Sequence, residues 1–497
     1  MSEEVIVKEV PVAVNADAYN SQVQVRHSHV FKGRKKILVD DTDIDEFNVL
    51  SVLQEAVNIH NGNQWEIEYL YNYYRGDQPI LQRIKTVRPE INNMIVENRA
   101  NEIVSFKVGY LMGEPLQYVA HCENEEITDD LNELNEYMFV EDKPSKDKEL
   151  ADWMHICGTG YRMVLPSDVD LEGVPFKIYT LDPRYTFVVY SNVLGEPPLM
   201  AVKFILKKDG NVVYSVYTKN RYFEIVNNEI VVDEFHAMQN IPIIEYPLNS
   251  ARLGAFEIVL DLLDAINDTA SNRQDGIDQF VQSLMRFHNV DISSEDFMQL
   301  KYLGAIKYKD IDPGFKAEVD YITSELNQTQ TETLVKHQYN TVLEIVGMPS
   351  VADGSTSDSS NNGAIILKNG WQNAEARAKD TELMFKLSEK KFLQLVLWIC
   401  RNQRRRENNL DLRLGNIEVR FTRRQYENLL SKAQVFQTLI SQEKLAPEYA
   451  FTQSGLFLDP MRAYTESMEY YEKQKEIANR ESENDTTDSG DLREAIE

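Results

Sequence analysis

Cysteine is scarce in this chain of 497 residues, which contains only Cys122, Cys157 and Cys400. The three are far apart and odd in number, which argues against a disulfide framework and against a zinc site of the CxxC type. The same usage fits a reduced compartment. We therefore interpret all three as buried structural thiols.

Long hydrophobic runs are also missing. The longest nearly apolar run, Leu393–Cys400, contains Gln394 and is far shorter than the roughly 18 residues of a membrane-spanning helix. The first residues, Met1–Glu4, are acidic and have no apolar core, so they do not resemble a secretory signal. We expect a soluble chain that stays inside a cell until it assembles.

Sequence motifs of common catalytic sites are absent. The chain has no G-x-x-x-x-G-K-[ST], H-E-x-x-H or G-x-S-x-G pattern. Gly158-Thr159-Gly160 precedes a predicted strand, whereas a dinucleotide loop follows one, so we interpret it as a helix-to-strand turn. The acidic run Asp40–Asp43 is better explained as a helix cap with solvated charge than as a nuclease site. We predict no catalytic residue, no metal site and no cofactor.

Positive charge is in short supply. Against 80 acidic residues there are 52 lysines and arginines, which gives a formal net charge of −28. Such a chain cannot neutralise DNA phosphates over its whole surface. Either nucleic acid plays no part in its function, or DNA comes close and must not be retained, and charge alone does not separate the two. The densest basic cluster is interpreted as favourable charge at a helix C-terminus, with DNA contact as the alternative; it consists of Arg401, Arg404, Arg405 and Arg406.

The most informative pattern that is present lies between Ala251 and Arg406. An amphipathic helical stripe runs to Leu284, and after a compact insert a second helix ends at Gly347-Met348-Pro349. A loop of small polar residues follows, and a helical pattern then runs from Ala364 towards Arg406. This order is unusual for an enzyme and indicates a function that depends on shape.

The rest of the chain predicts an α+β fold. Short strands at close spacing, joined by turns such as Asp209-Gly210-Asn211, fill the region between Tyr161 and Tyr246 and predict an antiparallel sheet. The first predicted helix begins near Asp43 and runs through Val57. Further helices are predicted at Gln64–Tyr74, Glu90–Tyr110, Lys146–Ile156, Gln425–Ser441 and Asp459–Arg480, and one further strand is predicted at Ile417–Phe421.

The order of these elements resembles the stem, clip, stem, tunnel loop and long wing helix of tailed-phage portal proteins. The chain is most similar to the portal family typified by the Bacillus phage SPP1. Segments of the N-terminal half strengthen the resemblance, which covers roughly Asp43 to Arg480; they are Tyr71–Asp77, Arg88–Asn93, Asn98–Val104 and Gly109–Leu116.

The resemblance implies a division of the chain into named parts. These are a mobile N-terminal arm (1–40), the wing (41–250), the first stem helix (251–284), the clip (285–326), the second stem helix (327–347), the tunnel loop (348–363), the long wing helix (364–410), the crown (411–480) and a disordered acidic tail (481–497).

Three groups of residues follow as candidates for the functional surfaces. The tunnel loop would line the channel with Asp353, Gly354, Ser355, Thr356, Ser357, Asp358, Ser359, Ser360, Asn361 and Asn362. The channel face of the first stem helix would carry Glu257, Asp261, Asp264, Asp268, Asp275 and Asp278. The clip would contact neighbouring subunits through Phe287, Val290, Phe297, Leu300, Leu303 and Ile306.

The function that the resemblance implies is that of a non-enzymatic channel. A ring, with twelve subunits in this family, would sit at one capsid vertex, where double-stranded DNA passes without sequence specificity during packaging and ejection. It would assemble with scaffold and major capsid protein in the host cytoplasm, and would then bind terminase and head-completion adaptors. In the virion it would connect the head to the tail, without contact to a membrane. The alternative is an acidic α+β enzyme or another virion adaptor that shares only the layout.

Overall fold

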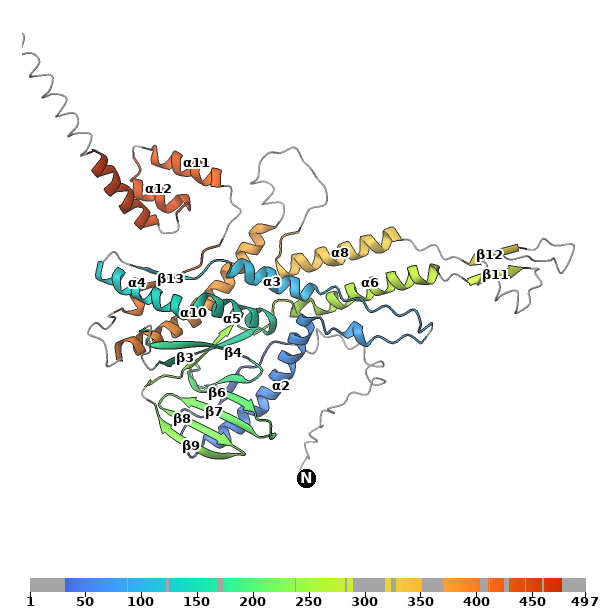
Figure 1. Ribbon diagram of the computed structural model, residues 1–497, viewed down its shortest axis with the longest axis horizontal. Coiled ribbons are helices and arrows are strands. Elements are labelled where there is room, and N and C mark those ends of the chain that lie inside the picture. The colour runs from blue at the N-terminus through green and yellow to red at the C-terminus, as the bar shows by residue number, and fades with distance from the viewer. Residues whose placement is uncertain are drawn as a thin grey trace, which may run out of the picture.

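The computed structural model describes residues 32–86, 88–121, 125–167, 173–236, 238–281, 284–288, 318–322, 328–350, 370–402, 410, 412–423, 429–442, 444–457 and 460–475. In Figure 1 these residues form a broad body, from which two helices and a two-stranded sheet project to one side. Helices and mostly antiparallel sheets are combined in one chain, so the predicted α+β class is confirmed.

A six-stranded sheet with the order β1-β5-β6-β7-β8-β9 forms one end of the body. Strand β1 (Ile37–Val39) pairs parallel with β5, and this pairing is not predicted from the sequence. All other neighbouring strands of the sheet pair antiparallel. Its other strands are β5 (Thr186–Ser191), β6 (Pro198–Leu206), β7 (Val212–Thr218), β8 (Arg221–Val226) and β9 (Glu229–Phe235).

A three-stranded antiparallel sheet, β10-β3-β4, joins the six-stranded sheet to the helices. Because side chains alternate along β3, Tyr161 and Met163 pack towards β5, while Gly160 and Arg162 face the helices. A Cβ at Gly160 would lie 2.8 Å from the Leu150 side chain, so this glycine permits close packing against α5. The elements here are β3 (Thr159–Pro166), β4 (Phe176–Leu181), β10 (Ile243–Pro247), α5 (Lys143–Cys157) and α10 (Trp371–Asn402).

Helix α2 (Val49–Arg75) is one continuous element, although the sequence predicts two helices here. Asn63 lies in its middle, and its side chain exchanges two 2.8 Å hydrogen bonds with the backbone of Lys35. These hydrogen bonds stabilise α2 at a position where Asn and Gly residues suggest the end of a helix. The helix ends at Gly76, whose φ of 98° is the left-handed conformation of a C-terminal glycine cap.

Helix α3 (Arg99–Leu111) is shorter than the predicted Glu90–Tyr110. Its start is set by Asn98, whose side chain accepts a hydrogen bond from the backbone N–H of Asn101. Two elements were not predicted, namely β2 (Gln117–Ala120), which pairs with β13 (Ile417–Arg420), and α4 (Glu125–Val140). Six acidic residues obscure the apolar pattern of α4, which buries Leu131, Leu134, Tyr137 and Met138 in the main core.

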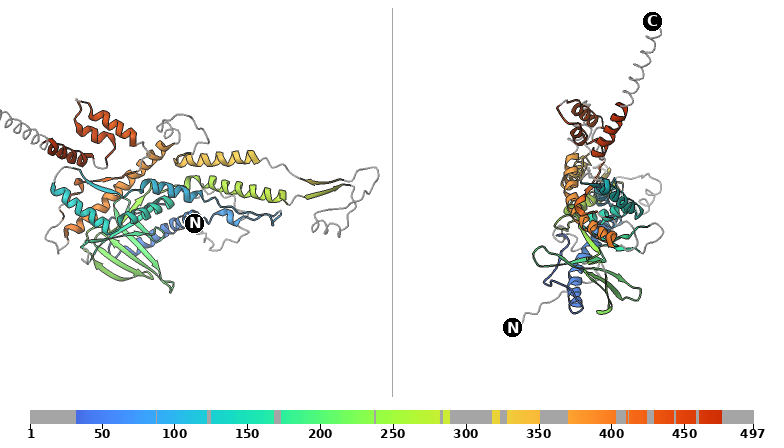
Figure 2. Two further views of the ribbon diagram at one scale, coloured as in Figure 1. Left: turned by 45° about the horizontal axis from the view of Figure 1, so that its top comes forward. Right: turned by 90° about the vertical axis from the view of Figure 1, so that its left-hand side faces the viewer.

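The C-terminal helices lie together on one side of the body (Figures 1 and 2). They are α11 (Leu429–Ile440), α12 (Pro447–Ser454) and a helix over 460–475. The sequence predicts no helix between Gln425–Ser441 and Asp459–Arg480, which is wrong, because Pro447 starts α12 and Gly455, at φ 61°, ends it. Phe436, Phe451 and Phe457 pack their rings 4.9–5.3 Å apart between these helices.

Candidate functional site

The two projecting helices are α6 (Leu260–Val281) and α8 (Gln328–Val346), which pack side by side. They lead to β11 (Leu284–His288) and β12 (Glu318–Ile322), which pair antiparallel. At about 1.5 Å per residue, the 22 residues of α6 span roughly 33 Å. We refer to α6 and α8 as the stem.

The first stem helix begins later than predicted, at Leu260 instead of Ala251. Arg252 adopts a left-handed φ of 55°, and a Cβ at Gly254 would lie 2.4 Å from the carbonyl oxygen of Ile156. The backbone N–H of Gly254 then donates a 2.8 Å hydrogen bond to Glu257, at the start of a short 3-10 turn. The chain therefore packs closely against the end of α5 before the helix can start.

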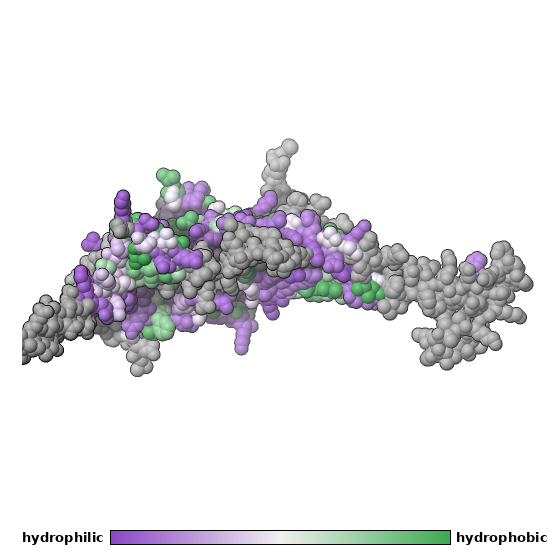
Figure 3. Space-filling model, turned by 90° about the horizontal axis from the view of Figure 1, so that it is seen from above, coloured by the Kyte–Doolittle hydropathy of each residue, from purple (hydrophilic) through white to green (hydrophobic). Residues whose placement is uncertain are grey.

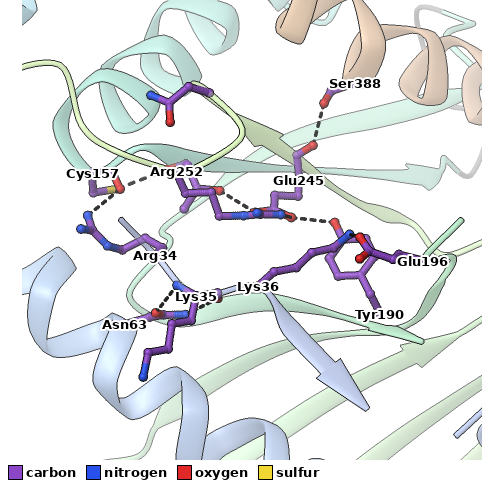
Figure 4. A network of polar contacts seen from close by, with 12 residues as sticks. Arg34, Lys35, Lys36, Asn63, Cys157, Tyr190, Glu196, Glu245, Arg252 and Ser388 are labelled. Carbon is purple, nitrogen blue, oxygen red and sulfur yellow. Dashed lines mark hydrogen bonds and ion pairs between the residues drawn. The ribbon is translucent and has the colours of Figure 1, made fainter. Parts of the chain in front are cut away.

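Buried ion pairs fix this root of the stem (Figure 4). Arg34 donates to the carbonyl oxygen of Cys157 at 2.9 Å and to Glu257 at 2.6 Å. Arg252 pairs with Glu245 through contacts of 2.6 and 3.0 Å. Burial alone would raise the pKa of Glu245, but the Arg252 guanidinium holds this pKa below its usual value. Glu257 is itself only 3% exposed, so its predicted place on an open channel face is wrong.

One side of α6 is covered by a strap, which we define as residues 88–97. Polar side chains at every fourth position of α6 accept hydrogen bonds from alternate backbone N–H groups of the strap. The strap therefore needs no strand partner for these donors, and its extended course replaces the predicted start of α3. The three pairs are Asn93 with Asp275 at 2.7 Å, Ile95 with Ser271 at 2.9 Å and Glu97 with Asn267 at 2.8 Å.

Two predicted channel residues are engaged by this strap and its neighbours. Asp275 is 4% exposed and also pairs with Lys85 and Arg83. Burial alone would raise its pKa, but the hydrogen bonds from Lys85 and Asn93 hold this pKa below its usual value. Asp278 accepts a 2.7 Å hydrogen bond from the side chain of Asn93. Asp275 therefore does not fit an exposed channel face, because the chain itself covers it.

Asp264 faces α2, where the hydroxyl of Tyr73 donates to it at 2.8 Å. Burial raises the pKa of Asp264 to about 7, against the opposite effect of that hydrogen bond. Asp261 and Asp268 are exposed and lie two helical turns apart, so they share a face of α6. These two remain predictions for a channel face.

Most of the other predicted site residues lie outside the described residues. This holds for the tunnel loop from Asp353 to Asn362 and for Val290, Phe297, Leu300, Leu303 and Ile306 of the clip. The backbone of Phe287 belongs to β11, opposite Val319.

The points where the chain leaves α8 and enters α10 are adjacent. A Cβ at Gly370 would lie 3.8 Å from the Cα atom of Pro349. Helix α3 contacts both helices here, because Lys107 donates to the carbonyl oxygen of Val346 at 2.7 Å and Tyr110 donates to Glu375 at 2.8 Å. The two ends of the segment between Pro349 and Gly370 therefore lie next to each other, and α3 holds the helices on both sides of it.

Of the four arginines of the basic cluster, the structure describes Arg401. Arg423, which precedes the C-terminal helices, pairs with Glu375 and Glu382 in the first half of α10. Arg401 lies at the opposite end of α10, where its guanidinium donates to the carbonyl oxygen of Leu412. The other three arginines of the cluster fall outside the described residues.

A buried ionic cluster at the centre of the body was not found by sequence reasoning. Lys143 contacts Asp147 at 2.6 Å and Glu389 at 2.9 Å, and Arg162 bonds to the same two carboxylates. Tyr246 donates to Glu389 at 2.7 Å. Burial alone would raise the pKa of Glu389, but Lys143 and Arg162 hold this pKa below its usual value. The cluster ties α10 to α5 and to the three-stranded sheet.

Within the described residues there is no group of three or more His, Cys, Asp or Glu side chains that could hold a metal ion. In the same part of the chain, no helix is both long enough and apolar enough to cross a membrane.

Comparison with solved structures found weak likenesses. One is to a chain in a structure described as the neck of an empty gene transfer agent particle computed with C6 symmetry, with TM-score 0.38, 13% identity, and coverage of 72% of this chain and 90% of that chain. Another is to a chain in the virion of a native gene transfer agent particle, with the same TM-score and identity, and coverage of 72% and 89%. Likeness at this level carries no information on function.

Comparison with curated proteins returned no match. Comparison with protein families is decisive, because the family described as phage portal protein, SPP1 Gp6-like, matches residues 53–486. The match includes the stem, the strap and all four sheets of the described residues, apart from β1. This chain therefore belongs to the SPP1 Gp6-like family of phage portal proteins.

Proposed function

We propose that copies of this protein assemble into a ring, with twelve subunits as the number that the family implies. The stems of the ring surround a channel at one capsid vertex, through which double-stranded DNA is packaged and later ejected. The observation that carries this proposal is the stem, a helix pair that projects from the body of a chain whose family is that of phage portal proteins.

The stem surface supports contact between neighbouring chains. Its helices expose Ile277 on α6 and Leu334 and Ile345 on α8. In Figure 3 most of the described surface is hydrophilic, and hydrophobic patches lie over the body and along one side of the stem. Apolar side chains that are exposed in one chain can be buried between adjacent stems of a ring.

The net charge of −28 supports a channel that DNA passes without binding. Phosphates are repelled by an acidic wall, so the DNA is not held at one position. Asp261 and Asp268 are the exposed carboxylates of α6 that we propose for this wall. The tunnel loop, residues 348–363, would form the narrowest part of the channel.

We further propose that the ring acts as a docking platform and not as an enzyme. Scaffold and major capsid protein would incorporate it into the procapsid. Terminase, which supplies the ATPase, would then bind at the clip end, and head-completion adaptors would replace it after packaging. The protein would thus act in the host cytoplasm during assembly and at the portal vertex of the virion.

A packaging assay tests this function. Procapsids built from the coat and scaffold proteins encoded with this chain, with or without the chain, are mixed with terminase, ATP and DNA. We expect DNA protected from nuclease only when the chain is present. Equal protection in its absence would refute the proposal. It would favour the alternative of a virion adaptor that shares only the layout.

A further inference from the structure

Two helices of the wing expose apolar residues on sides that face away from the core. On α10, Leu383 and Leu387 are 69% and 56% exposed. On α4, Phe139 is 80% exposed. Isolated exposed apolar residues are common, but these three occur beside charged residues of opposite sign on the two helices.

The exposed side of α10 is mainly basic, because Lys379, Lys390 and Lys391 outnumber the one exposed acidic residue there, Asp380. Phe385, Glu389 and Phe392 are buried and point to the core. At 100° per residue, Leu383, Leu387, Lys390 and Lys391 lie on the opposite side of the helix, and all four are exposed. We define these four residues as the basic stripe.

The exposed side of α4 is acidic. This helix has six Asp and Glu residues and no Lys or Arg. Asp129, Glu136 and Phe139 are exposed, on the side opposite the buried Leu134 and Tyr137. We define these three residues as the acidic stripe. Asp129 and Phe139 also line a groove of about 1370 Å³ between α4, β2, β13 and the helix over 460–475, which leaves room for incoming side chains.

The two stripes belong to different sides of a thin molecule. In the end-on view of Figure 2, α10 and α4 lie towards opposite sides of the body. One chain therefore cannot pair its own stripes, whereas two chains stacked side to side can. A contact between different surfaces of identical chains is heterologous, and it closes into a ring when the rotation per subunit allows.

We propose that the basic stripe of α10 docks on the acidic stripe of α4 in the next copy of this chain. An antiparallel alignment of the helices places Leu387 beside Phe139, and Lys390 and Lys391 beside Glu136. The leucine and phenylalanine lose exposed apolar area, and the flanking charges fix the register. Two basic stripes or two acidic stripes cannot pair in this way, because their like charges repel each other. This inference rests on the proposed ring and assigns its wing contact.

Charge reversal in the full-length chain tests the contact. Lys390→Glu with Lys391→Glu should raise the protein concentration at which half of the chains are in rings by at least tenfold, as measured by mass photometry. Asp129→Lys with Glu136→Lys should do the same. Combination of all four substitutions should restore the midpoint to within about threefold of the wild type. The matched control is Lys207→Glu with Lys208→Glu, an exposed lysine pair in the β6–β7 turn, which should leave the midpoint unchanged.

The possible results separate this inference from the ring itself. The contact would be overturned if both reversal variants formed rings at the same midpoint concentration as the wild type. It would also be overturned if the variant with all four substitutions had a midpoint as high as the two double variants. Either result would leave the portal function standing. A wild-type chain that stays monomeric would overturn the ring proposal. If a reversal variant fails to fold, Phe139→Cys with Leu387→Cys replaces it. Oxidation should then give a ladder of covalent oligomers that Phe139→Cys alone does not give, and the same pattern in both would refute the contact.

Discussion

Asp264 joins the stem to α2 through Tyr73, and burial raises its pKa to about 7. An unfolded aspartate titrates near pH 3.9. Between these two values the folded chain binds more protons than the unfolded chain, so the free energy of unfolding falls as the pH rises. The stabilising effect of the protonated form is complete below about pH 4 and is lost as the pH passes 7.

Asp264→Asn should flatten this part of the pH profile. Asparagine keeps an oxygen that accepts from Tyr73 but does not ionise. Between pH 5 and pH 8, we expect the wild type to lose roughly 2–3 kcal/mol more of its free energy of unfolding than the variant. Urea unfolding at several pH values measures the difference. Asp380→Asn, at an exposed position of α10, should follow the wild type. Parallel profiles for Asp264→Asn and the wild type would contradict this account.

Glu389 balances two buried cations, Lys143 and Arg162. Glu389→Gln leaves the shape nearly unchanged but leaves those cations with only Asp147, so we expect a loss of roughly 3–5 kcal/mol. The control is Glu332→Gln, which breaks an exposed pair with Lys336 at 3.4 Å and should cost less than about 1 kcal/mol. Denaturant unfolding of both variants provides the comparison. Equal losses would show that the cluster does not stabilise the body.

At the scale of elements, we expect the contacts that flank the tunnel loop to matter more for folding than the loop itself. Pro349 and Gly370 are adjacent, and Lys107 and Tyr110 brace the helices on either side. Deletion of Gly354–Asn361 should therefore leave the free energy of unfolding and ring formation nearly unchanged. If the loop narrows the channel as proposed, packaging should still fall.

The deletion variant is examined by mass photometry and by the packaging assay. Loss of rings would make the loop a structural interface, and packaging at the wild-type rate would make it an ordinary surface connection. Asp353→Lys with Asp358→Lys should slow packaging more at low salt than at high salt, because added salt screens the attraction to phosphates.

Sequence patterns predict an element well where one periodic stripe faces one core. The stem helix α8 and most strands between β3 and β9 are of this kind, and their apolar spacing marks them. The strap and the root of the stem are not predictable in this way. Asn267, Ser271 and Asp275 read as solvated residues of α6, and only the fold shows that they bind the backbone of the strap. The buried Lys143 and Glu389 were missed for the same reason, because their partners lie far away in the sequence.

At the scale of the whole molecule, the order of elements was more informative than any residue. Helix, insert, helix, polar loop and long helix predicted the portal family, and the family comparison confirms it. The position of single side chains relative to a channel depends on how neighbouring chains pack. Glu257 and Asp275 were assigned to the wrong surface for a different reason, because the partners that bury them, Arg34 and the strap, lie far away in the sequence.

The central claim is that this chain forms a closed ring with its stems around a channel. Electron microscopy of the purified full-length protein, with enough top views to count subunits, tests it most directly. We predict closed rings with a central opening, with twelve subunits as the expected number, and with Asp261 and Asp268 facing the opening. Monomers or dimers at micromolar concentration over a range of salt conditions, or rings whose stems lie away from the symmetry axis, would contradict the account.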